Sequence, residues 1–312
     1  MSAQRKFRFG AQVYKAPSAA VWAEKARKIA DLGYSSLLMP DHFHETLGPL
    51  VALTAAALAA PTLRIGTLVL DNDFRHPVEL AKELATLDLM TEGRLELGIG
   101  AGWMLTDYQQ SGIPYDLPQV RIDRFEEALA ILKGLFRSGL YSFAGKHYTI
   151  TQLDGQTKPV QKPHPPIMIG AGRKRMLAIA AREADIVNVT FSMRRGVWDH
   201  EASATGTAKA TAKKMQWLRA VAGERLNAIE LSVPVFVAEV TDQQRSAAER
   251  IAPQYGLTPE QVLGSPHFLV GSLDWIIEEI ERRRAEYGFS YFIFGRETHV
   301  ALAPVVARLT GT

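Results

Sequence analysis

The chain has 312 residues, of which 47% are hydrophobic and 22% charged, and it contains no cysteine. This composition is typical of a globular protein with a large buried core. It excludes a disordered or disulfide-stapled chain, a thiolate nucleophile and a cysteine-ligated metal. The net charge is only +3, from 36 basic and 33 acidic residues spread along the chain, so we expect no nucleic-acid partner.

The sequence also carries no pattern typical of export or of membrane insertion. The opening residues, MSAQRKFRFG, lack the apolar stretch and small-residue cleavage site of a signal peptide. The longest uncharged apolar stretch, Leu47 to Leu63, is interrupted by Pro49 and Pro61, so we expect a buried helix too short to span a bilayer. We therefore expect a cytoplasmic protein with no membrane partner.

Apolar runs of strand length alternate with segments of helical period along the whole chain. The predicted strands are Phe7–Val13, Ser36–Met39, Leu63–Leu70, Arg94–Ile99, Pro166–Ile169, Asp185–Val189, Leu231–Val237 and Tyr291–Phe294. The predicted helices are Ser18–Leu32, Gly48–Ala60, Val78–Thr91, Arg121–Phe136, Lys174–Ala184, Ala208–Ala222, Leu273–Tyr287 and Thr298–Leu309. These βα units predict a single α/β domain over residues 1–312, a (β/α)8 TIM barrel with insertions on its C-terminal face.

Three segments do not fit a βα unit and are expected to be insertions. Residues 141–150 alternate and turn at Ala144-Gly145, which predicts a small hairpin. Residues 190–207 are polar and could form a mobile lid over the C-terminal face. Residues 241–264 are expected to form short helical turns after the seventh strand.

The active site of such a barrel lies where the strands end, so the residues that follow each strand are the candidates. Asp41 and His42 follow the second strand, and a carboxylate beside an imidazole can move protons at neutral pH, although a turn aspartate beside a packed histidine is the alternative. His42 and His44 also have the spacing of paired metal ligands, but no further ligands follow later strands, so we expect no metal site.

Two further candidate segments are rich in glycine, and each lies at the end of a predicted strand. Gly98, Gly100 and Gly102 end the fourth strand, where they either let a flat ring approach the backbone or act as spacers inside the barrel; their spacing is not that of a dinucleotide fingerprint. The stretch Gly170-Ala171-Gly172-Arg173 ends the fifth strand and begins a helix. It is expected to bind phosphate at the helix N-terminus, the alternative being an ordinary turn in the left-handed region.

These stretches resemble the luciferase-like monooxygenase superfamily, and in particular its branch of oxidoreductases that depend on the deazaflavin coenzyme F420. The resemblance covers most of the chain. It is carried by LLMPDHFHETLGP, LRIGTLVLDNDFRHPVELAKELATLDLMTEGRLELGIGAGW, YQQSGIPYDLPQVRIDRFEEALAILKGLF, KPVQKPHPPIMIGAGRKRMLAIAAREADIVN and a terminal FIF strand.

The resemblance implies that the cofactor ring lies in the barrel mouth against Asp41 and His42. A non-prolyl cis peptide at Leu68-Val69 would back the ring, and Gly170, Gly172 and Arg173 would hold the phosphate. The cofactor-binding set expected from the resemblance and from strand-end position is Asp41, His42, Leu68, Val69, Gly100, Ala101, Gly102, Trp103, Gly170, Ala171, Gly172 and Arg173. His42 is expected to transfer the proton, oriented by Asp41, and these two are the catalytic candidates.

The sequence departs from the family pattern in two ways. Trp103 stands where relatives that oxidise a sugar phosphate have a glutamate, which favours a flat or apolar substrate or a wall for the cofactor. Residues 104–107 contain no arginine for a flavin phosphate, which favours F420 over FMN. Gln12, Tyr14, Asn188 and Arg296 are weaker candidates for the cavity wall, named from strand-end position.

We therefore expect an enzyme that exchanges a hydride between F420 and a small organic substrate. The alternative enzyme is an FMN-dependent monooxygenase served by a separate reductase, with residues 190–207 closing the pocket. A flavin- or deazaflavin-binding protein without turnover is the alternative of another class. Relatives suggest a homodimer, and a flavin or F420 reductase is a candidate partner.

Overall fold

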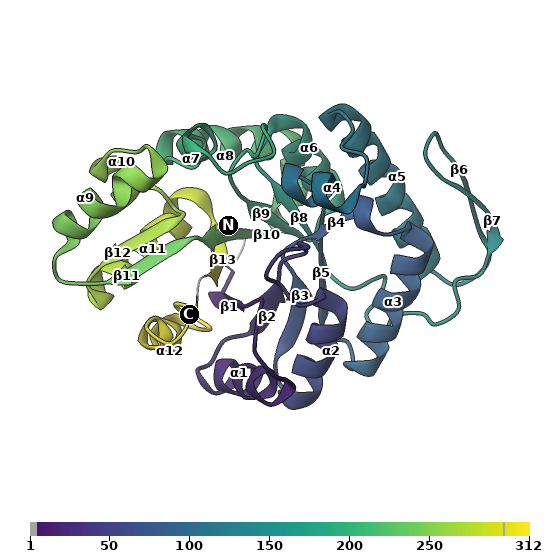
Figure 1. The fold of residues 1–312 in the computed structure, drawn as a ribbon, viewed down its shortest axis with the longest axis horizontal. Helices are drawn as coiled ribbons and strands as arrows, with labels where there is room; N and C mark the ends of the chain where they lie inside the picture. Colours follow the sequence, from purple (N-terminus) through teal and green to yellow (C-terminus); the bar gives the residue numbers. More distant parts are fainter. Residues whose placement is uncertain (1–4, 296) are drawn as a thin grey trace.

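Parallel strands close into a barrel in the computed structural model, which describes residues 5–295 and 297–312 (Figure 1). The strands of this sheet are β1 (Arg8–Gln12), β2 (Ser36–Met39), β3 (Arg64–Thr67), β4 (Leu70–Asp71), β5 (Leu95–Gly100), β8 (Ile167–Ala171), β9 (Ile186–Val189), β10 (Glu230–Val235) and β13 (Phe289–Phe294). The order is β3-β2-β1-β13-β10-β9-β8-β5-β4, and the β3–β5 pairing closes the ring. The predicted eight-stranded TIM barrel is thereby confirmed.

The third predicted strand is divided into β3 and β4, which occupy one position in the barrel because both pair with β5. The Leu68–Val69 peptide between them is cis, as expected. The barrel interior is filled by side chains of β2, β8, β9 and β13, with Leu68 packed against them.

The N-terminal end of the barrel is closed by a buried ionic cluster. Glu96 accepts hydrogen bonds from Arg8 (2.5 Å) and Arg64 (2.8 Å), and Tyr291 also donates to it (3.2 Å). Burial alone would raise the pKa of Glu96, but the two guanidinium groups hold that pKa below its usual value. The cavity described below lies at the opposite, C-terminal end of the barrel.

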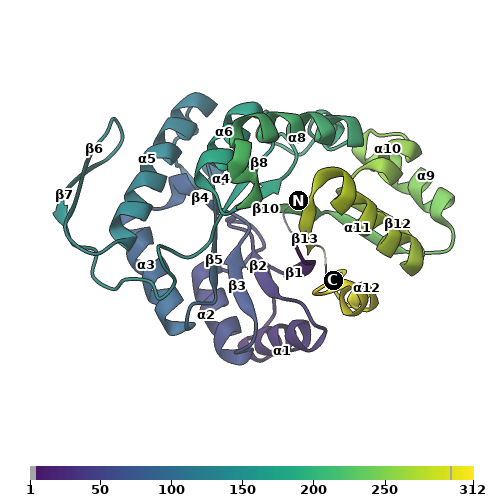
Figure 2. The same cartoon turned by 180° about the vertical axis from the view of Figure 1, so that it is seen from behind.

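An outer ring of helices covers the barrel (Figure 2). These helices are α1 (Ala19–Asp31), α2 (Pro49–Ala59), α3 (Pro77–Met90), α5 (Pro118–Phe136), α6 (Lys174–Glu183), α8 (Ala208–Ala222), α11 (Leu273–Tyr287) and α12 (Ala303–Leu309). In α1, Trp22, Ala26 and Ile29 recur at helical spacing and are buried, and the Ser18 hydroxyl caps the helix. None of the described helices is long and apolar enough to cross a bilayer.

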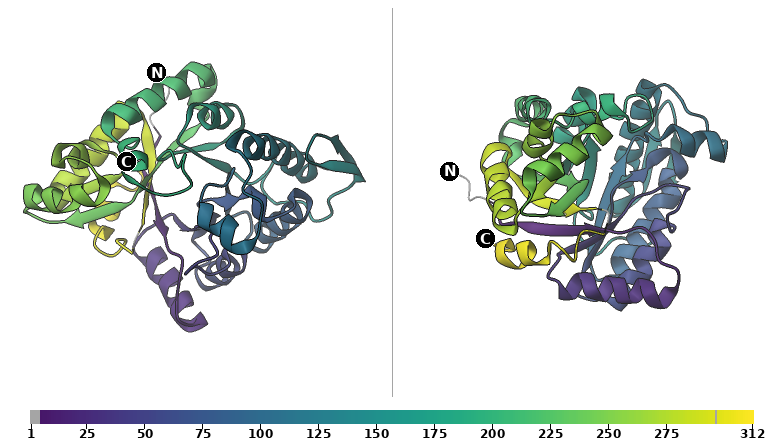
Figure 3. Two further views of the ribbon diagram at one scale, coloured as in Figure 1. Left: turned by 45° about the horizontal axis from the view of Figure 1, so that its top comes forward. Right: turned by 60° about the vertical axis from the view of Figure 1, so that its left-hand side comes forward.

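The expected hairpin is present and projects from one end of the molecule, opposite the lobe described next (Figure 3). It consists of β6 (Tyr141–Ala144) and β7 (Thr149–Leu153), which pair antiparallel. Its turn is held by Glu127 of α5, whose carboxylate accepts backbone hydrogen bonds from Lys146 (2.7 Å), His147 (2.9 Å) and Tyr148 (3.1 Å).

At the other end of the molecule, a small lobe differs from the prediction. The strand expected over Leu231–Val237 ends at Val235, and β11 (Val237–Val240) then pairs with an unpredicted strand, β12 (Phe268–Gly271). Helices α9 (Gln244–Tyr255) and α10 (Pro259–Gly264) lie between these two strands in the chain. The prediction missed β12 because a four-residue apolar run has no period of its own. Glu239, which follows the predicted seventh strand, lies in β11 and pairs with Arg250 (2.6 Å).

The remaining short elements are α4 (Leu105–Ser111), α7 (His200–Ala204) and the 3-10 turns η1 (Asn72–Phe74) and η2 (Gly223–Asn227). Of these, α4 directly follows β5, and α7 lies inside the polar segment 190–207. Both segments border the C-terminal end of the barrel, and Leu105 donates a backbone hydrogen bond to Gly196 (2.9 Å). The segment 190–207 is therefore packed against the start of α4.

Candidate active site

A cavity of about 970 Å³ lies at the C-terminal ends of the barrel strands. Its wall contains all but one of the residues that the sequence suggested for cofactor binding, so strands far apart in the chain bring them together. The exception is Ala171, whose side chain is buried in the hydrophobic core. Gln12 and Asn188 also line the cavity, Tyr14 does not, and Arg296 lies outside the described residues.

Val69 forms part of the cavity wall, and two glycines leave its side chain uncovered. A Cβ atom on Gly100 would lie 3.0 Å from one Val69 methyl group, and a Cβ atom on Gly170 would lie 3.6 Å from the same group. Both glycines line the cavity. Because neither carries a side chain, a flat molecule can approach the backbone here.

Of the three glycines that end the fourth predicted strand, the remaining two, Gly98 and Gly102, have structural roles. A Cβ atom on Gly98 would lie 1.8 Å from the Thr67 carbonyl oxygen, so Gly98 allows two strands to approach. Gly102 has a φ of +73°, and a Cβ atom there would lie 2.5 Å from an Asp71 carboxylate oxygen. The structure thus shows Gly98 as a spacer between strands, and the approach of a flat ring at Gly100 stays a prediction.

His42 contacts an aspartate that the sequence analysis did not single out. Its Nδ1 lies 2.7 Å from Oδ2 of Asp107, in the first turn of α4. Asp107 is buried, and its other carboxylate oxygen accepts a hydrogen bond from the Phe43 backbone (3.2 Å). The Trp103 ring meets the His42 imidazole edge-on, with ring centroids 5.7 Å apart.

The expectation that Asp41 orients His42 is wrong. Arg75 binds both carboxylate oxygens of Asp41, at 2.6 and 3.1 Å, and the Asp71 backbone also donates to one of them (3.1 Å). The two side chains are adjacent in sequence but contact different partners. Asp41 therefore fixes the β4 end of the cavity, and its hydrogen bonds go to Arg75 and the Asp71 backbone rather than to the His42 ring.

Asp71, at the end of β4, is a carboxyl group without a cationic partner in the described chain. It accepts hydrogen bonds from the Tyr108 hydroxyl (2.9 Å) and from the Asp73 backbone (2.9 Å), and it lines the cavity. Burial raises the pKa of Asp71 to about 7. It can therefore exchange a proton near neutral pH.

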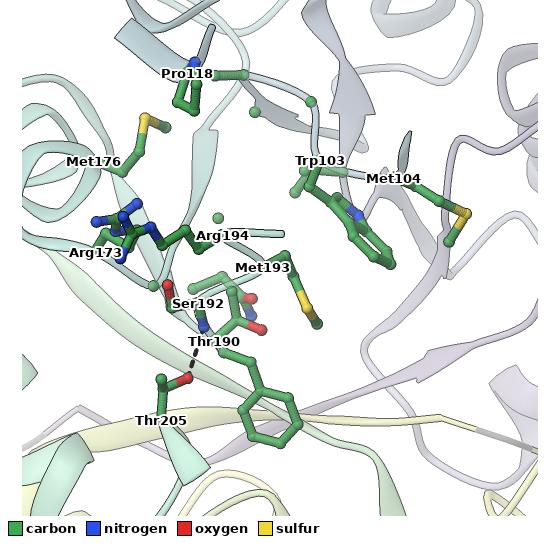
Figure 4. Close-up of a pocket in the computed structure, with 18 of the residues that line it drawn as sticks. Trp103, Met104, Pro118, Arg173, Met176, Thr190, Ser192, Met193, Arg194 and Thr205 are labelled. Atoms are coloured by element: carbon green, nitrogen blue, oxygen red, sulfur yellow. Dashed lines mark hydrogen bonds between the residues drawn. The ribbon is translucent and has the colours of Figure 1, made fainter. Parts of the chain in front are cut away.

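Cations gather on the opposite side of the cavity, where α6 begins. Figure 4 shows Arg194 extending toward the side occupied by Arg173, with Trp103 across the cavity. Arg173, Lys174 and Arg194 are exposed, and within residues 5–295 and 297–312 none of them pairs with an acid. The first turn of α6 contains no acidic residue and its N-cap has no side-chain hydrogen bond. This end of the cavity thus suits an anion.

The glycines before α6 are not in the left-handed region, so the alternative of an ordinary left-handed turn is wrong. Gly172 is required for another reason. A Cβ atom there would lie 2.0 Å from the Phe191 carbonyl oxygen. The segment that follows β9 therefore packs directly on this turn.

Lys214 of α8 is a further cavity residue that the sequence analysis missed. It is buried, and its Nζ donates to the Thr190 carbonyl oxygen (2.6 Å). Burial lowers the pKa of Lys214 to about 7. Its remaining N–H groups can donate to an oxygen of a ligand.

A sequence signal existed for only one of these missed residues. Asp107 follows β5 by a few residues in a short polar segment, and any acid near a strand end is a candidate. Lys214 lies mid-helix, where a lysine normally faces solvent. Among the described residues, no group of three or more histidines and acids is placed to hold a metal ion.

Comparison with known proteins shows that most of the chain matches the model of one protein family. Residues 5–289 match the model of the family described as luciferase-like monooxygenase. A solved structure of the coenzyme F420-dependent tetrahydromethanopterin reductase of Methanopyrus kandleri is similar over 98% of this chain and 99% of that chain. Its TM-score is 0.78 at 16% sequence identity, a likeness of fold.

Two curated relatives match over shorter stretches. The FMNH2-dependent dimethylsulfone monooxygenase of Pseudomonas putida is 32% identical over 146 residues, which are 46% of this chain and 39% of that protein. The F420-dependent glucose-6-phosphate dehydrogenase of Amycolatopsis mediterranei is 29% identical over 170 residues, 52% of this chain and 50% of that protein. The matches thus span half or less of the length of these relatives, and they include users of both cofactors.

Proposed function

Because the chain belongs to the luciferase-like monooxygenase family, we propose that it exchanges a hydride between coenzyme F420 and a small organic substrate at the barrel mouth. The cavity of about 970 Å³ is at the upper end of the usual range for ligand pockets, roughly 300–1,000 Å³. It offers room for a tricyclic ring beside a small molecule.

One observation carries the proposal: the cavity joins a stretch of wall that side chains leave uncovered to a cluster of cations without acidic partners among the described residues. Gly100, Val69 and Gly170 supply the uncovered stretch. Arg173, Arg194 and the first turn of α6 supply the cations and free N–H groups. A molecule with a planar ring and an anionic tail fits both parts at once, and both F420 and FMN have this form.

A bound deazaflavin supplies the hydride chemistry, since it carries two electrons as a hydride. The chain itself has to orient ring and substrate and to manage one proton. We assign the proton to His42, which lines the cavity. Phe191, Met193 and Trp103 would exclude water from the reacting centre.

An FMN-dependent monooxygenase served by a separate reductase is the second candidate. Its support is the 32% identity to the dimethylsulfone enzyme and the contact of segment 190–207 with α4, which would keep the pocket dry. Against it, residues 104–107 supply no arginine for a flavin phosphate. The homodimer and the reductase partner expected from the resemblance belong to the proposal in either case.

The test is a titration of the purified protein with F420 and, separately, with FMN. We expect a dissociation constant at least about tenfold lower for F420, a difference of about 1.4 kcal/mol. Arg173→Ala should weaken binding, whereas Arg182→Ala, which lies on the same helix but pairs with Glu126, should not. Tighter binding of FMN, with oxygen consumption when reduced FMN is supplied, would favour the monooxygenase. If neither molecule binds, the proposal fails.

A further inference from the structure

The pairing of His42 with a distant aspartate determines how the imidazole can act. Asp107 is 65 residues away in the chain, and its Oδ2 lies 2.7 Å from His42 Nδ1. The side chain of Asp107 is only 3% exposed and that of His42 19% exposed. The contact is therefore largely shielded from water, where a charge-assisted hydrogen bond is stronger than at the surface.

An ionised carboxylate can only accept hydrogen bonds, so His42 Nδ1 must carry the proton in this pair. The other ring nitrogen, Nε2, then holds the lone pair and has no partner among the described residues. Because His42 lines the cavity, Nε2 is the atom available to exchange a proton with a bound molecule.

Asp107 itself is held in place by its surroundings. Its Oδ1 accepts from the Phe43 backbone (3.2 Å), and its own backbone N–H donates to Met104 (3.1 Å) at the start of α4. His44 also approaches it, with Nδ1 3.5 Å from Oδ1. The His44 ring is half exposed, and it approaches Oδ1 rather than the Oδ2 that contacts His42. Asp107 is thus a fixed acceptor rather than a mobile one.

We propose that Asp107 is the positioning residue for His42. It sets the Nδ1–H tautomer, fixes the ring against Trp103, and stabilises the imidazolium that forms when Nε2 accepts a proton. This inference deepens the proposed function and rests on it for the role of His42 in the reaction. The tautomer, however, is a property of the chain and can be measured without cofactor or substrate.

The substitution Asp107→Asn reverses the hydrogen-bond polarity at His42. The Phe43 backbone N–H needs an acceptor, so it holds the amide oxygen of the new side chain at the position of Oδ1. The amide nitrogen then faces His42 Nδ1 and donates to it. Nδ1 must become the acceptor, and the proton moves to Nε2. Size and shape hardly change, so the effect is one of polarity.

The experiment is a long-range ¹H–¹⁵N spectrum of the protein with ¹⁵N-labelled histidine, recorded where the imidazoles are neutral. The chain has eight histidines, and the His42 signals are assigned by their loss in His42→Gln. We expect the Nδ1–H pattern for His42 in the wild type and the Nε2–H pattern in Asp107→Asn. Asp41→Asn is the matched control, because Asp41 binds Arg75, and it should leave the His42 pattern unchanged.

Two outcomes would overturn the assignment. One is an Nε2–H pattern for His42 in the wild type, which needs no variant and so remains decisive if Asp107→Asn does not fold. The other is the same change of His42 signals in Asp41→Asn as in Asp107→Asn. Failure of the proposed function would appear separately, as an absence of F420 and FMN binding, and would leave this measurement intact.

Discussion

Replacing Lys214 by methionine tests how strongly the cavity wall desolvates this side chain. Lys214 is buried, donates one hydrogen bond to the Thr190 carbonyl, and has no acidic partner within the described chain. Methionine is similar in length and volume and carries no charge. The variant therefore removes a buried cation while the packing of α8 changes little.

The direction of the pH effect follows from the two pKa values of Lys214. In the folded chain burial lowers the pKa to about 7, whereas the ordinary value of 10.5 applies to the unfolded chain. Below pH 7 the amine is charged in both states, so the folded state bears the full free-energy cost of burying this charge. Between pH 7 and 10.5 only the unfolded chain keeps the proton, so stability rises with pH by about 1.4 kcal/mol per pH unit.

Between pH 7 and pH 9, the wild type should gain about 2 kcal/mol of unfolding free energy relative to Lys214→Met, because the slope reaches its full value only above the folded-state pKa. The assay is urea unfolding followed by tryptophan fluorescence at several pH values, with the two proteins compared at each, so that shared titrations cancel. Lys213→Met is the matched control: this neighbouring side chain is exposed, so little buried charge is removed. A Lys214→Met difference that stays constant from pH 7 to 9 would refute the reasoning.

Three further predictions concern the glycine turn, the unpaired acid and a buried ion pair. Gly172→Ala places a methyl group 2.0 Å from the Phe191 carbonyl oxygen and should cost about 1–3 kcal/mol in urea unfolding and weaken F420 binding. Gly48→Ala, with open space around it, is the control, and equal effects would remove the role assigned to this turn. Burial raises the pKa of Asp71 from 3.8 to about 7, so only the folded chain keeps this proton between these values. As the pH rises from 5 to 7, the wild type should therefore lose about 1.4 kcal/mol of unfolding free energy per pH unit relative to Asp71→Asn. A difference between the two proteins that is independent of pH would mean that the pKa of Asp71 is not raised. Glu279→Gln leaves the fully buried Arg283 without its carboxylate (2.9 Å) and should cost about 3–5 kcal/mol, whereas exposed Glu278→Gln should leave the midpoint of unfolding unchanged. Equal midpoints for the two glutamate variants would contradict this assignment.

Much of the fold could be predicted from the sequence because helices and strands leave a period in it. The bounds of α8 and α11 coincide with the prediction, since each is an uninterrupted run of helical period, and the bounds of β2 coincide as well. The last helix begins at Ala303 rather than Thr298, because turns that local composition does not distinguish from a helix precede it.

For the site, the order of the strands along the chain is enough to predict which residues share the C-terminal rim of the barrel. Parallel strands that close into a barrel must bring their C-terminal ends to one rim, so Asp41, His42, the β5 glycines and the turn before α6 had to lie near one another. That conclusion needs only the order of elements along the chain.

The tertiary structure alone decided the partners of these side chains. Asp41 and His42 are neighbours in sequence, yet one binds Arg75 and the other Asp107. Lys214 looks like a surface lysine until segment 190–207 covers it. The physical reason is that a side chain's partner and its burial are set by which distant segments pack on it. Periodicity along the chain carries no record of that packing.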